Sequence, residues 1–270
     1  MFFTDLDARI DAVDSVLCVG LDSALDRVPD HLHEFDLPRW AFNRRIIDAT
    51  SEFVAAYKPN VAFYEDPDGW RALEETIAYA QGKGVPVVLD AKRGDVGHTA
   101  RQYATLLDRA DAVTVSPYMG RDSLEPFLSR AEKGVFVLCR TSNPGGADLQ
   151  DLELASGEPV YERVAALADL WNANDNVGVV VGATASAELE AVREIVPDLP
   201  FLVPGVGAQG GNAEAAVEYG LVGGVGLVNA SRSVIYAGEG RGDGSAEEEE
   251  FDKAAREAAK RLSRQLNRYR

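Results

Sequence analysis

The segment Asp90–Thr99 holds the densest group of side chains that could do chemistry. It reads Asp-Ala-Lys-Arg-Gly-Asp-Val-Gly-His-Thr. If an extended strand ends here, Asp90 and Lys92 point to the same side of it, because side chains alternate along a strand. Asp95 follows after a glycine turn, so the ammonium group of Lys92 would lie between two carboxylates.

An ammonium group placed between carboxylates keeps its proton, because nearby opposite charges favour the ionised form. Such a lysine is a poor nucleophile and a poor base, but it can stabilise negative charge and donate a proton to a strongly basic carbon. The segment therefore disfavours Schiff-base chemistry and favours chemistry at a carbanion. The alternative is a buried ion-pair network that only fixes local structure, although such networks are weak sources of stability.

A second group of residues, nearer the end of the chain, could bind a phosphate. The glycine-rich segment 204–211 is followed by the segment 229–233, which reads Asn-Ala-Ser-Arg-Ser. Glycines free backbone amides for an anion, Gln209 can donate from its amide, and Arg232 can bind two phosphate oxygens. The alternative is that these glycines only form tight turns. A phosphate site here would indicate a class of ligand and not a reaction.

Ser142 is a third candidate, within Arg-Thr-Ser-Asn-Pro-Gly at 140–145. Its hydroxyl and backbone amide could read a flat polar ring through a paired donor and acceptor, but a turn-forming serine is equally open. His98 has no Asp or Cys at metal or triad spacing. No cluster of His, Cys and Asp has the spacing of a metal site, so no metal is expected.

The elements that would position these residues form a repeat. Continuous Val, Leu and Ile runs are typical of strands buried on both faces of a parallel sheet, and helix-like segments separate most of these runs. Eight such units in 270 residues predict an α/β fold, a (β/α)₈ TIM barrel. The alternative is an open doubly wound sheet, but no Gly-x-Gly-x-x-Gly follows the first run. The predicted strands are 16–22, 55–61, 86–92, 112–117, 134–142, 177–184, 200–205 and 224–230.

A barrel of this kind performs its chemistry at the carboxyl ends of its strands. Charged groups that close apolar runs are costly without partners, so the ring of residues at these ends is a candidate site. Those residues are Asp22, Lys58, Asp90, Lys92, Ser116, Ser142, Thr184, Gly205 and Asn229.

The whole chain, 1–270, is expected to form one barrel domain with an extra C-terminal helix. The predicted helical segments are 71–82, 99–109, 121–131, 159–173, 185–195 and 212–219. Residues 245–270 predict a terminal helix packed on the barrel, with Ser245 as its N-cap. Residues 143–158 form a long loop after the fifth strand.

Charge and composition restrict the partners and the compartment. Forty-four Asp and Glu oppose 27 Lys and Arg, which gives a net charge of −17 and makes nucleic acid a poor partner. A surface rich in acids and poor in Lys favours adaptation to concentrated salt, although an ordinary acidic protein remains the alternative. No apolar run is long enough to span a membrane, and no signal peptide is visible. Two cysteines in apolar runs indicate reduced core thiols, so a cytoplasmic location is expected.

Taken together, the motifs resemble those of the orotidine 5′-monophosphate decarboxylase family, in its longer-chain (type 2) branch. The resemblance covers nearly the whole chain, and its combination of motifs is highly specific. The matching pieces are Leu21-Asp22, Lys58-Pro59-Asn60, Asp90-x-Lys92-x-x-Asp95-x-x-x-Thr99, Ser116-Pro117-Tyr118-x-Gly120, Thr141-Ser142-Asn143-Pro144-Gly145, Pro204-Gly205-x-Gly207-x-Gln209-Gly210 and Ser231-Arg232.

The resemblance implies a homodimeric barrel that converts orotidine 5′-phosphate (OMP) to UMP and CO₂ without a metal or an organic cofactor. It also implies a role for each matching position. Lys92 would protonate C6, within a charge array of alternating Lys and Asp to which the partner subunit contributes one Asp. The array is Lys58, Asp90, Lys92 and Asp95, with Asp95, Val96 and Thr99 reaching across the dimer interface.

The same resemblance implies the contacts of the remaining substrate groups. Asp22 and Lys58 would contact ribose hydroxyls, Ser142 the pyrimidine amide, and Gln209 with Arg232 the phosphate. Three further positions are expected to bind substrate, namely Pro204, Gly207 and Asn229.

Two other functions stay open at this point. Magnesium-dependent sugar-phosphate decarboxylases and synthases share the Asp-x-Lys-x-x-Asp motif, but they need a carboxylate at the position of Lys58 to hold the metal. A non-catalytic nucleotide sensor on the same barrel is the other alternative, although every charged position is intact.

Overall fold

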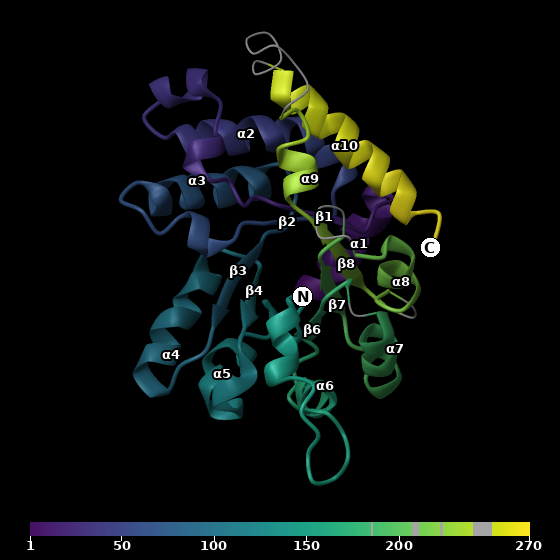
Figure 1. Ribbon diagram of the computed structural model, residues 1–270. Coiled ribbons are helices and arrows are strands. Elements are labelled where there is room, and N and C mark those ends of the chain that lie inside the picture. The colour runs from purple at the N-terminus through teal and green to yellow at the C-terminus, as the bar shows by residue number, and fades with distance from the viewer. Residues whose placement is uncertain (185, 207–210, 222–223, 240–249) are drawn as a thin grey trace.

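Eight parallel strands form the centre of the fold, as the sequence predicts (Figure 1). The computed structural model describes residues 1–184, 186–206, 211–221, 224–239 and 250–270. The hydrogen-bonded strand order is β2-β1-β8-β7-β6-β5-β4-β3. The strands are β1 (Leu17–Gly20), β2 (Ala56–Lys58), β3 (Val88–Arg93), β4 (Ala112–Val115), β5 (Gly134–Arg140), β6 (Val177–Val181), β7 (Phe201–Pro204) and β8 (Gly226–Ala230).

Strands β2 and β3, at the two ends of this order, close the barrel through isolated parallel bridges. Tyr57 bridges Val87, and Asn60 bridges Asp90. The amide of Asp90 donates to the carbonyl of Pro59 over 2.9 Å. The sheet therefore returns on itself, and the open doubly wound alternative is wrong.

The strands are buried along nearly their whole length. Every residue of β1, β2, β4, β6 and β8 is buried. Helices cover the outside of the sheet, and side chains fill its inside, so both faces of each strand meet apolar groups. This explains why the sequence shows continuous apolar runs instead of alternating ones.

Helices surround the strands, with α2 and α3 beside β2, α4 and α5 beside β3 and β4, and α6, α7 and α8 around the remaining side (Figure 1). The predicted helical segments are confirmed with small shifts at their ends. The helices are α1 (Phe2–Val13), α2 (Pro38–Thr50), α3 (Gly69–Gly82), α4 (Gly97–Ala104), α5 (Arg121–Leu128), α6 (Val160–Leu170), α7 (Ser186–Ile195), α8 (Ala213–Glu218), α9 (Arg232–Ile235) and α10 (Phe251–Leu266).

Helix α1, which the sequence analysis did not identify, packs at the amino end of strand β5. The rings of Phe2 and Phe3 meet the ring of Phe136 edge-on, with centroids 6.2 and 5.5 Å away. Gly134 allows this approach, because a Cβ there would lie 2.3 Å from the ring of Phe2. The amino end of the barrel is thus occupied by packing residues.

The predicted C-terminal helix is present as α10, and it packs against α2 and α9. The rings of Phe251 and Phe42 stack with centroids 4.9 Å apart. The predicted N-cap, Ser245, lies outside the described residues. Among the residues that are described, no helix is both long and apolar enough to cross a membrane.

Candidate active site

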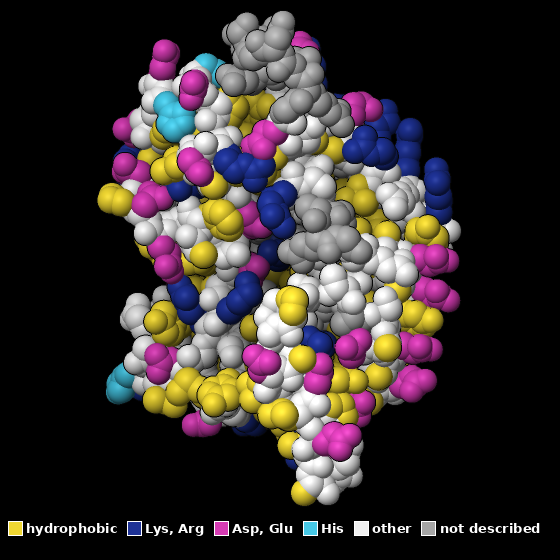
Figure 2. Space-filling view, in the orientation of Figure 1, with side chains coloured by type: hydrophobic (Ala, Val, Ile, Leu, Met, Phe, Trp, Pro, Cys, Tyr) yellow, Lys and Arg dark blue, Asp and Glu magenta, His cyan; other side chains and the backbone are white. Residues whose placement is uncertain are grey.

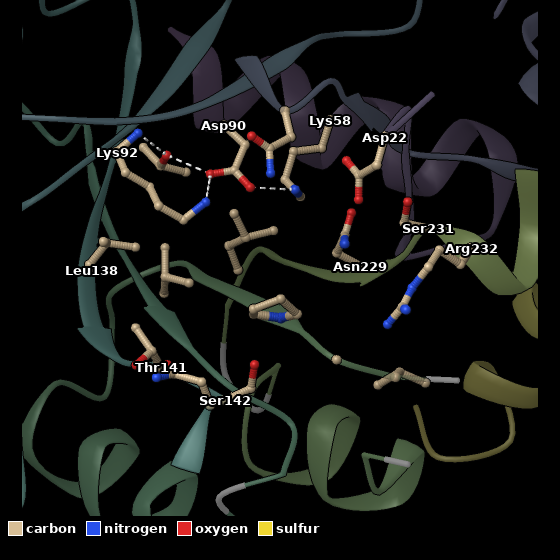
Figure 3. A pocket seen from close by; sticks show the side chains of 18 residues that line it. Asp22, Lys58, Asp90, Lys92, Leu138, Thr141, Ser142, Asn229, Ser231 and Arg232 are labelled. Carbon is tan, nitrogen blue, oxygen red and sulfur yellow. Dashed lines mark hydrogen bonds and ion pairs between the residues drawn. The ribbon is translucent and has the colours of Figure 1, made fainter. Parts of the chain in front are cut away.

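A cavity of about 280 Å³ opens at the carboxyl ends of the strands (Figure 3). Residues from the ends of all eight strands or from the loops after them line it, which matches the position expected for a barrel site. The lining residues are Asp22, Lys58, Asn60, Asp90, Lys92, Thr114, Leu138, Thr141, Ser142, Asn143, Val180, Leu202, Pro204, Gly205, Val206, Asn229, Ser231 and Arg232.

Asp90 lies between two lysines at one side of the cavity. Lys58 Nζ is 2.7 Å from Asp90 Oδ2, and Lys92 Nζ is 2.6 Å from Asp90 Oδ1. The side chain of Lys58 is 5% exposed, whereas that of Lys92 is 48% exposed. The buried pair therefore anchors the arrangement, while the ammonium group of Lys92 remains accessible to a bound molecule.

This arrangement keeps Asp90 and Lys58 ionised. Burial alone would raise the pKa of Asp90, but the charges of Lys58 and Lys92 outweigh it and hold that pKa well below its usual range. Burial alone would lower the pKa of Lys58, but the charges of Asp90 and Asp22 outweigh it and raise that pKa above its usual range. Neither group is suited to exchange protons near neutral pH.

Lys92 reaches Asp90 through an irregular backbone. The sequence predicts alternation along a regular strand, yet the pairing of β3 with β4 shifts register between Leu89 and Arg93. Lys92 has φ of 49°, in the left-handed region that residues other than glycine rarely adopt. Such a conformation costs about 1–3 kcal/mol and is typical of functional sites. The predicted convergence of Asp90 and Lys92 is correct, but regular alternation is not its cause.

Thr114 is a site residue that the sequence analysis missed. Its Oγ1 donates to Asp90 Oδ1 over 3.0 Å and accepts from the amides of Ala91 and Lys92 over 3.1 and 3.0 Å. It fixes both the carboxylate and the irregular turn that presents Lys92. A single threonine within the apolar run Ala-Val-Thr-Val was the signal that could have identified it.

Two buried oxygens on the other side of the cavity have no protein partner within the described residues. They are Asp22 Oδ1 and Asn229 Oδ1. In Figure 3 the carboxylate of Asp22 and the amide of Asn229 lie near each other, between Lys58 and Ser231. Because buried polar atoms are rarely left without partners, these oxygens are suited to contact hydroxyl groups of a ligand.

Arg232 begins the short helix α9 at the rim of the cavity and is exposed. Several Lys and Arg side chains lie beside the hollow at the centre of this face, although the protein is strongly acidic (Figure 2). Pro204 lines the cavity next to Gly205 and Val206. The predicted positions Gly207 and Gln209 lie outside the described residues.

Ser142 lines the cavity opposite the lysines, and the loop before α6 supports the residues next to it (Figure 3). Gln150 Oε1 accepts from the amide of Thr141, and Gln150 Nε2 donates to Thr141 Oγ1, each over 2.9 Å. Arg140 is buried, donates to the carbonyl of Thr141 over 2.7 Å, and pairs with Asp151 over 2.9 Å. The charge of Arg140 is thus engaged in holding the loop.

Several predicted positions do not line this cavity. Ser116 and Thr184 follow strands β4 and β6 but are not among the lining residues. Thr184 Oγ1 instead donates to the carbonyl of Ser142, which does line the cavity, over 3.1 Å. Asp95, Val96 and Thr99 follow β3 and are also absent from the cavity lining. Among the described residues, Lys92 forms its ion pair with Asp90 and none with Asp95.

Across the residues that the structure describes, no group of three or more His, Cys, Asp or Glu side chains could hold a metal ion. Both cysteines, Cys18 and Cys139, are buried and free, and burial raises the pKa of each thiol to about 12.

Comparison with known proteins supports the resemblance. Residues 15–246 match the family model described as "Orotidine 5'-phosphate decarboxylase / HUMPS family". The chain is 70% identical over 277 residues to an orotidine 5'-phosphate decarboxylase of Halorubrum lacusprofundi, covering 100% of this chain and 99% of the relative.

Solved structures agree with this assignment. The Leishmania donovani OMP decarboxylase superposes with a TM-score of 0.82 at 41% identity, covering 99% of this chain and 98% of that one. Leishmania donovani UMP synthase gives a TM-score of 0.83 at 42% identity over 98% of this chain, which spans 55% of that longer protein. The charge array, the eight-stranded barrel and these similarities agree, and the chain belongs to the orotidine 5'-phosphate decarboxylase / HUMPS family.

Proposed function

We propose that this protein is a carboxy-lyase that removes CO₂ from OMP and forms UMP. The observation that carries this proposal is the position of Asp90 between Lys58 and Lys92 in the cavity, with the Lys92 ammonium group accessible. A fixed cation beside the reacting carbon stabilises negative charge that develops only in the transition state.

The reaction requires one bond to break and one to form. When the bond between C6 and the carboxylate breaks, its electron pair stays on C6 and CO₂ leaves. Lys92 Nζ then donates a proton to C6, and solvent returns a proton to the amine. No electrons leave the substrate, so the step needs no oxidant, and we propose that it needs no metal or organic cofactor.

The remaining groups of the substrate find complementary chemistry along the cavity. Arg232, with Gln209, would bind the phosphate, Asp22 with Lys58 the ribose hydroxyls, and Ser142 the pyrimidine amide. The other proposed substrate contacts are Pro204, Gly207 and Asn229. Because the phosphate is remote from the bond that breaks, its binding energy can help to assemble the site.

We further propose a homodimer in which Asp95, Val96 and Thr99 complete the partner's site. The exposure of the segments after β3 and β4 supports this: Val96 is 51% exposed, Tyr118 81% and Met119 46%. Apolar side chains exposed together are typical of interaction surfaces.

Mixing two inactive variants tests the dimer. In a Lys92→Ala and Asp95→Ala heterodimer, one site would carry both changes and the other neither, because each site takes residues from both chains. Random mixing should therefore restore about a quarter of wild-type activity. Additive residual activity without restoration would contradict a shared site.

The alternatives receive less support. A magnesium-dependent sugar-phosphate enzyme would need a carboxylate where Lys58 stands, and Lys58 is instead paired with Asp90. A nucleotide sensor only binds its ligand, so it would not need the accessible ammonium group of Lys92 beside the carboxylate of Asp90. Both alternatives can be separated from decarboxylation by one assay.

The assay follows the loss of orotate-nucleotide absorbance after OMP is added, with EDTA present, in low and in molar KCl. Wild type should turn over in EDTA, and Lys92→Ala should lose at least about 10²–10⁴-fold in kcat, the contribution of a proton donor. Loss of activity in EDTA would favour the magnesium-dependent enzymes. UMP binding without turnover at either salt concentration would favour a sensor.

A further inference from the structure

The segment Gly20–Ala24, which contains Asp22, is held by side chains from distant parts of the chain. Four consecutive carbonyls of this segment each accept a hydrogen bond from a different side chain. The donors are Ser231 Oγ to Gly20 (3.1 Å), Tyr64 Oη to Leu21 (2.8 Å), Tyr236 Oη to Asp22 (3.1 Å) and Arg39 Nε to Ser23 (2.9 Å).

Tyr236 makes two of the contacts with this segment. Its hydroxyl donates to the carbonyl of Asp22 and accepts from the amide of Ala24 over 2.9 Å. One oxygen atom thus fixes the backbone on both sides of Ser23, directly after Asp22. The Oδ1 atom of Asp22 has no partner of its own within the described residues, so this backbone anchoring matters for the position of the carboxylate.

The ring of Tyr236 is itself fixed in place. It stacks on Phe42 with centroids 5.8 Å apart, and the guanidinium of Arg27 lies 3.6 Å from its centroid. Arg27 in turn pairs with Glu239. Burial raises the pKa of Tyr236, so its hydroxyl keeps the proton that it donates.

Tyr236 also joins this segment to the proposed phosphate contact. It follows helix α9, which begins with Arg232, and its amide donates to the carbonyl of Arg232 over 3.2 Å. A single residue therefore bonds through its backbone to Arg232 and through its side chain to Asp22.

We propose that Tyr236 is a positioning residue that holds the carboxylate of Asp22 at a fixed place relative to Arg232. The groups that contact the ribose and the phosphate of one nucleotide are then held at a fixed distance from each other. This inference rests on the proposed function, because it takes Asp22 as the ribose contact and Arg232 as the phosphate contact.

The test compares two ligands in two proteins. Dissociation constants are measured by calorimetry for UMP and for 2′,3′-dideoxyuridine 5′-monophosphate, which lacks both ribose hydroxyls. In wild type the dideoxy compound should bind more weakly. The measured ratio is the dissociation constant of the dideoxy compound divided by that of UMP. In Tyr236→Phe this ratio should fall about three- to tenfold, the equivalent of one hydrogen bond.

A purely structural role would weaken both ligands equally and leave the ratio unchanged, and that result would overturn the inference. Tyr79→Phe is the matched control, because it also loses a hydroxyl hydrogen bond, to Asp48 over 2.7 Å, on outer helices. In an Asp22→Ala background, Tyr236→Phe should no longer change the ratio. A further change there would show that Tyr236 does not act through Asp22.

Two additional measurements separate a failure of the inference from an unfolded variant and from a failure of the proposed function. If Tyr236→Phe does not fold, Arg27→Met removes the cation over the ring, and it should lower the ratio in the same direction. Turnover of OMP by wild type is measured separately. With turnover intact and the ratio unchanged, only the inference fails; without turnover, the proposed function fails, and the UMP ratio still decides the role of Tyr236.

Discussion

Thr114 Oγ1 donates to Asp90 Oδ1 over 3.0 Å, and this carboxylate oxygen also accepts from Lys92 Nζ. The same hydroxyl accepts from the amides of Ala91 and Lys92, so it connects the carboxylate to the turn that presents the ammonium group. The geometry of the charge array thus depends on a neutral residue of the neighbouring strand.

Replacement of Thr114 by Val should lower kcat with little change in KM. The substitution keeps the shape but leaves the amides of Ala91 and Lys92 without their acceptor and removes one of the two donors to Asp90 Oδ1, at a cost of about 1–3 kcal/mol. Steady-state kinetics with OMP would detect a fall of about tenfold or more in kcat.

Thr76→Val is the matched control for this experiment. Thr76 is equally buried, and its hydroxyl bonds to Ala72 and Asn43 in the outer helical layer. It should lose stability without losing kcat. An equal loss of kcat in both variants would contradict a specific role for Thr114.

The lowered pKa of Asp90 predicts how stability changes in acid. Because its pKa in the folded protein lies below the ordinary value of 3.8, its contribution is complete above that value and is lost as the pH falls toward the folded pKa. The difference in unfolding free energy between wild type and Asp90→Asn should be constant from pH 7 to 5. Below pH 4 it should shrink by up to about 1.4 kcal/mol per pH unit.

Urea unfolding of both proteins at fixed KCl measures this difference, and the subtraction removes the effect of the many surface acids. A difference that stays constant down to pH 3 would show that the folded and unfolded pKa values of Asp90 are alike. Because Asp90 stays ionised between pH 7 and 5, its titration should cause no fall in kcat over this range.

Replacement of Gln150 by Ala should raise KM more than it lowers kcat. It removes two hydrogen bonds that fix Thr141, directly before the proposed pyrimidine contact Ser142. A displacement there should raise KM about fivefold, equivalent to about 1 kcal/mol. Gln81→Ala, which removes bonds to Arg109 and Asp111 on the outside of the barrel, is the control. An unchanged KM in Gln150→Ala would contradict the positioning effect.

Concentrated salt should stabilise the protein. A net charge of −17 creates repulsion that is screened as the Debye length falls from about 10 Å at 0.1 M to about 3 Å at 1 M salt. The thermal midpoint should therefore rise between 0.1 and 2 M KCl. The increase of the midpoint with KCl concentration should be smaller when the exposed residues Asp7, Asp11 and Glu190 are replaced by their amides. A midpoint and an activity that both fall in molar KCl would refute salt adaptation.

The barrel could be predicted because each strand is buried on both faces and therefore appears as an uninterrupted apolar run. The end of each run also located the cavity, since Lys58, Asp90 and Asn229 interrupt apolar segments at positions where only a partner or a ligand makes a polar group tolerable.

The details that escaped prediction depend on contacts distant in sequence. Nothing local indicated that Thr114 would meet Asp90, because their pairing depends on the register between two strands. The left-handed backbone conformation of Lys92 could not be predicted, because residues other than glycine rarely adopt it. The ion pair between Arg140 and Asp151 likewise forms only when the long loop folds back, so the sequence alone does not indicate it.

The bridge between Asn60 and Asp90 gives the cavity a second property. Strands β2 and β3 meet only through isolated bridges, so this junction has fewer backbone hydrogen bonds than the paired strands elsewhere in the barrel. Lys58 and Asp90 lie on opposite sides of that junction, and their ion pair spans it. The groups proposed to act on the substrate therefore also hold the ring of strands shut, so any fluctuation that separates β2 from β3 must also pull apart the proposed catalytic pair.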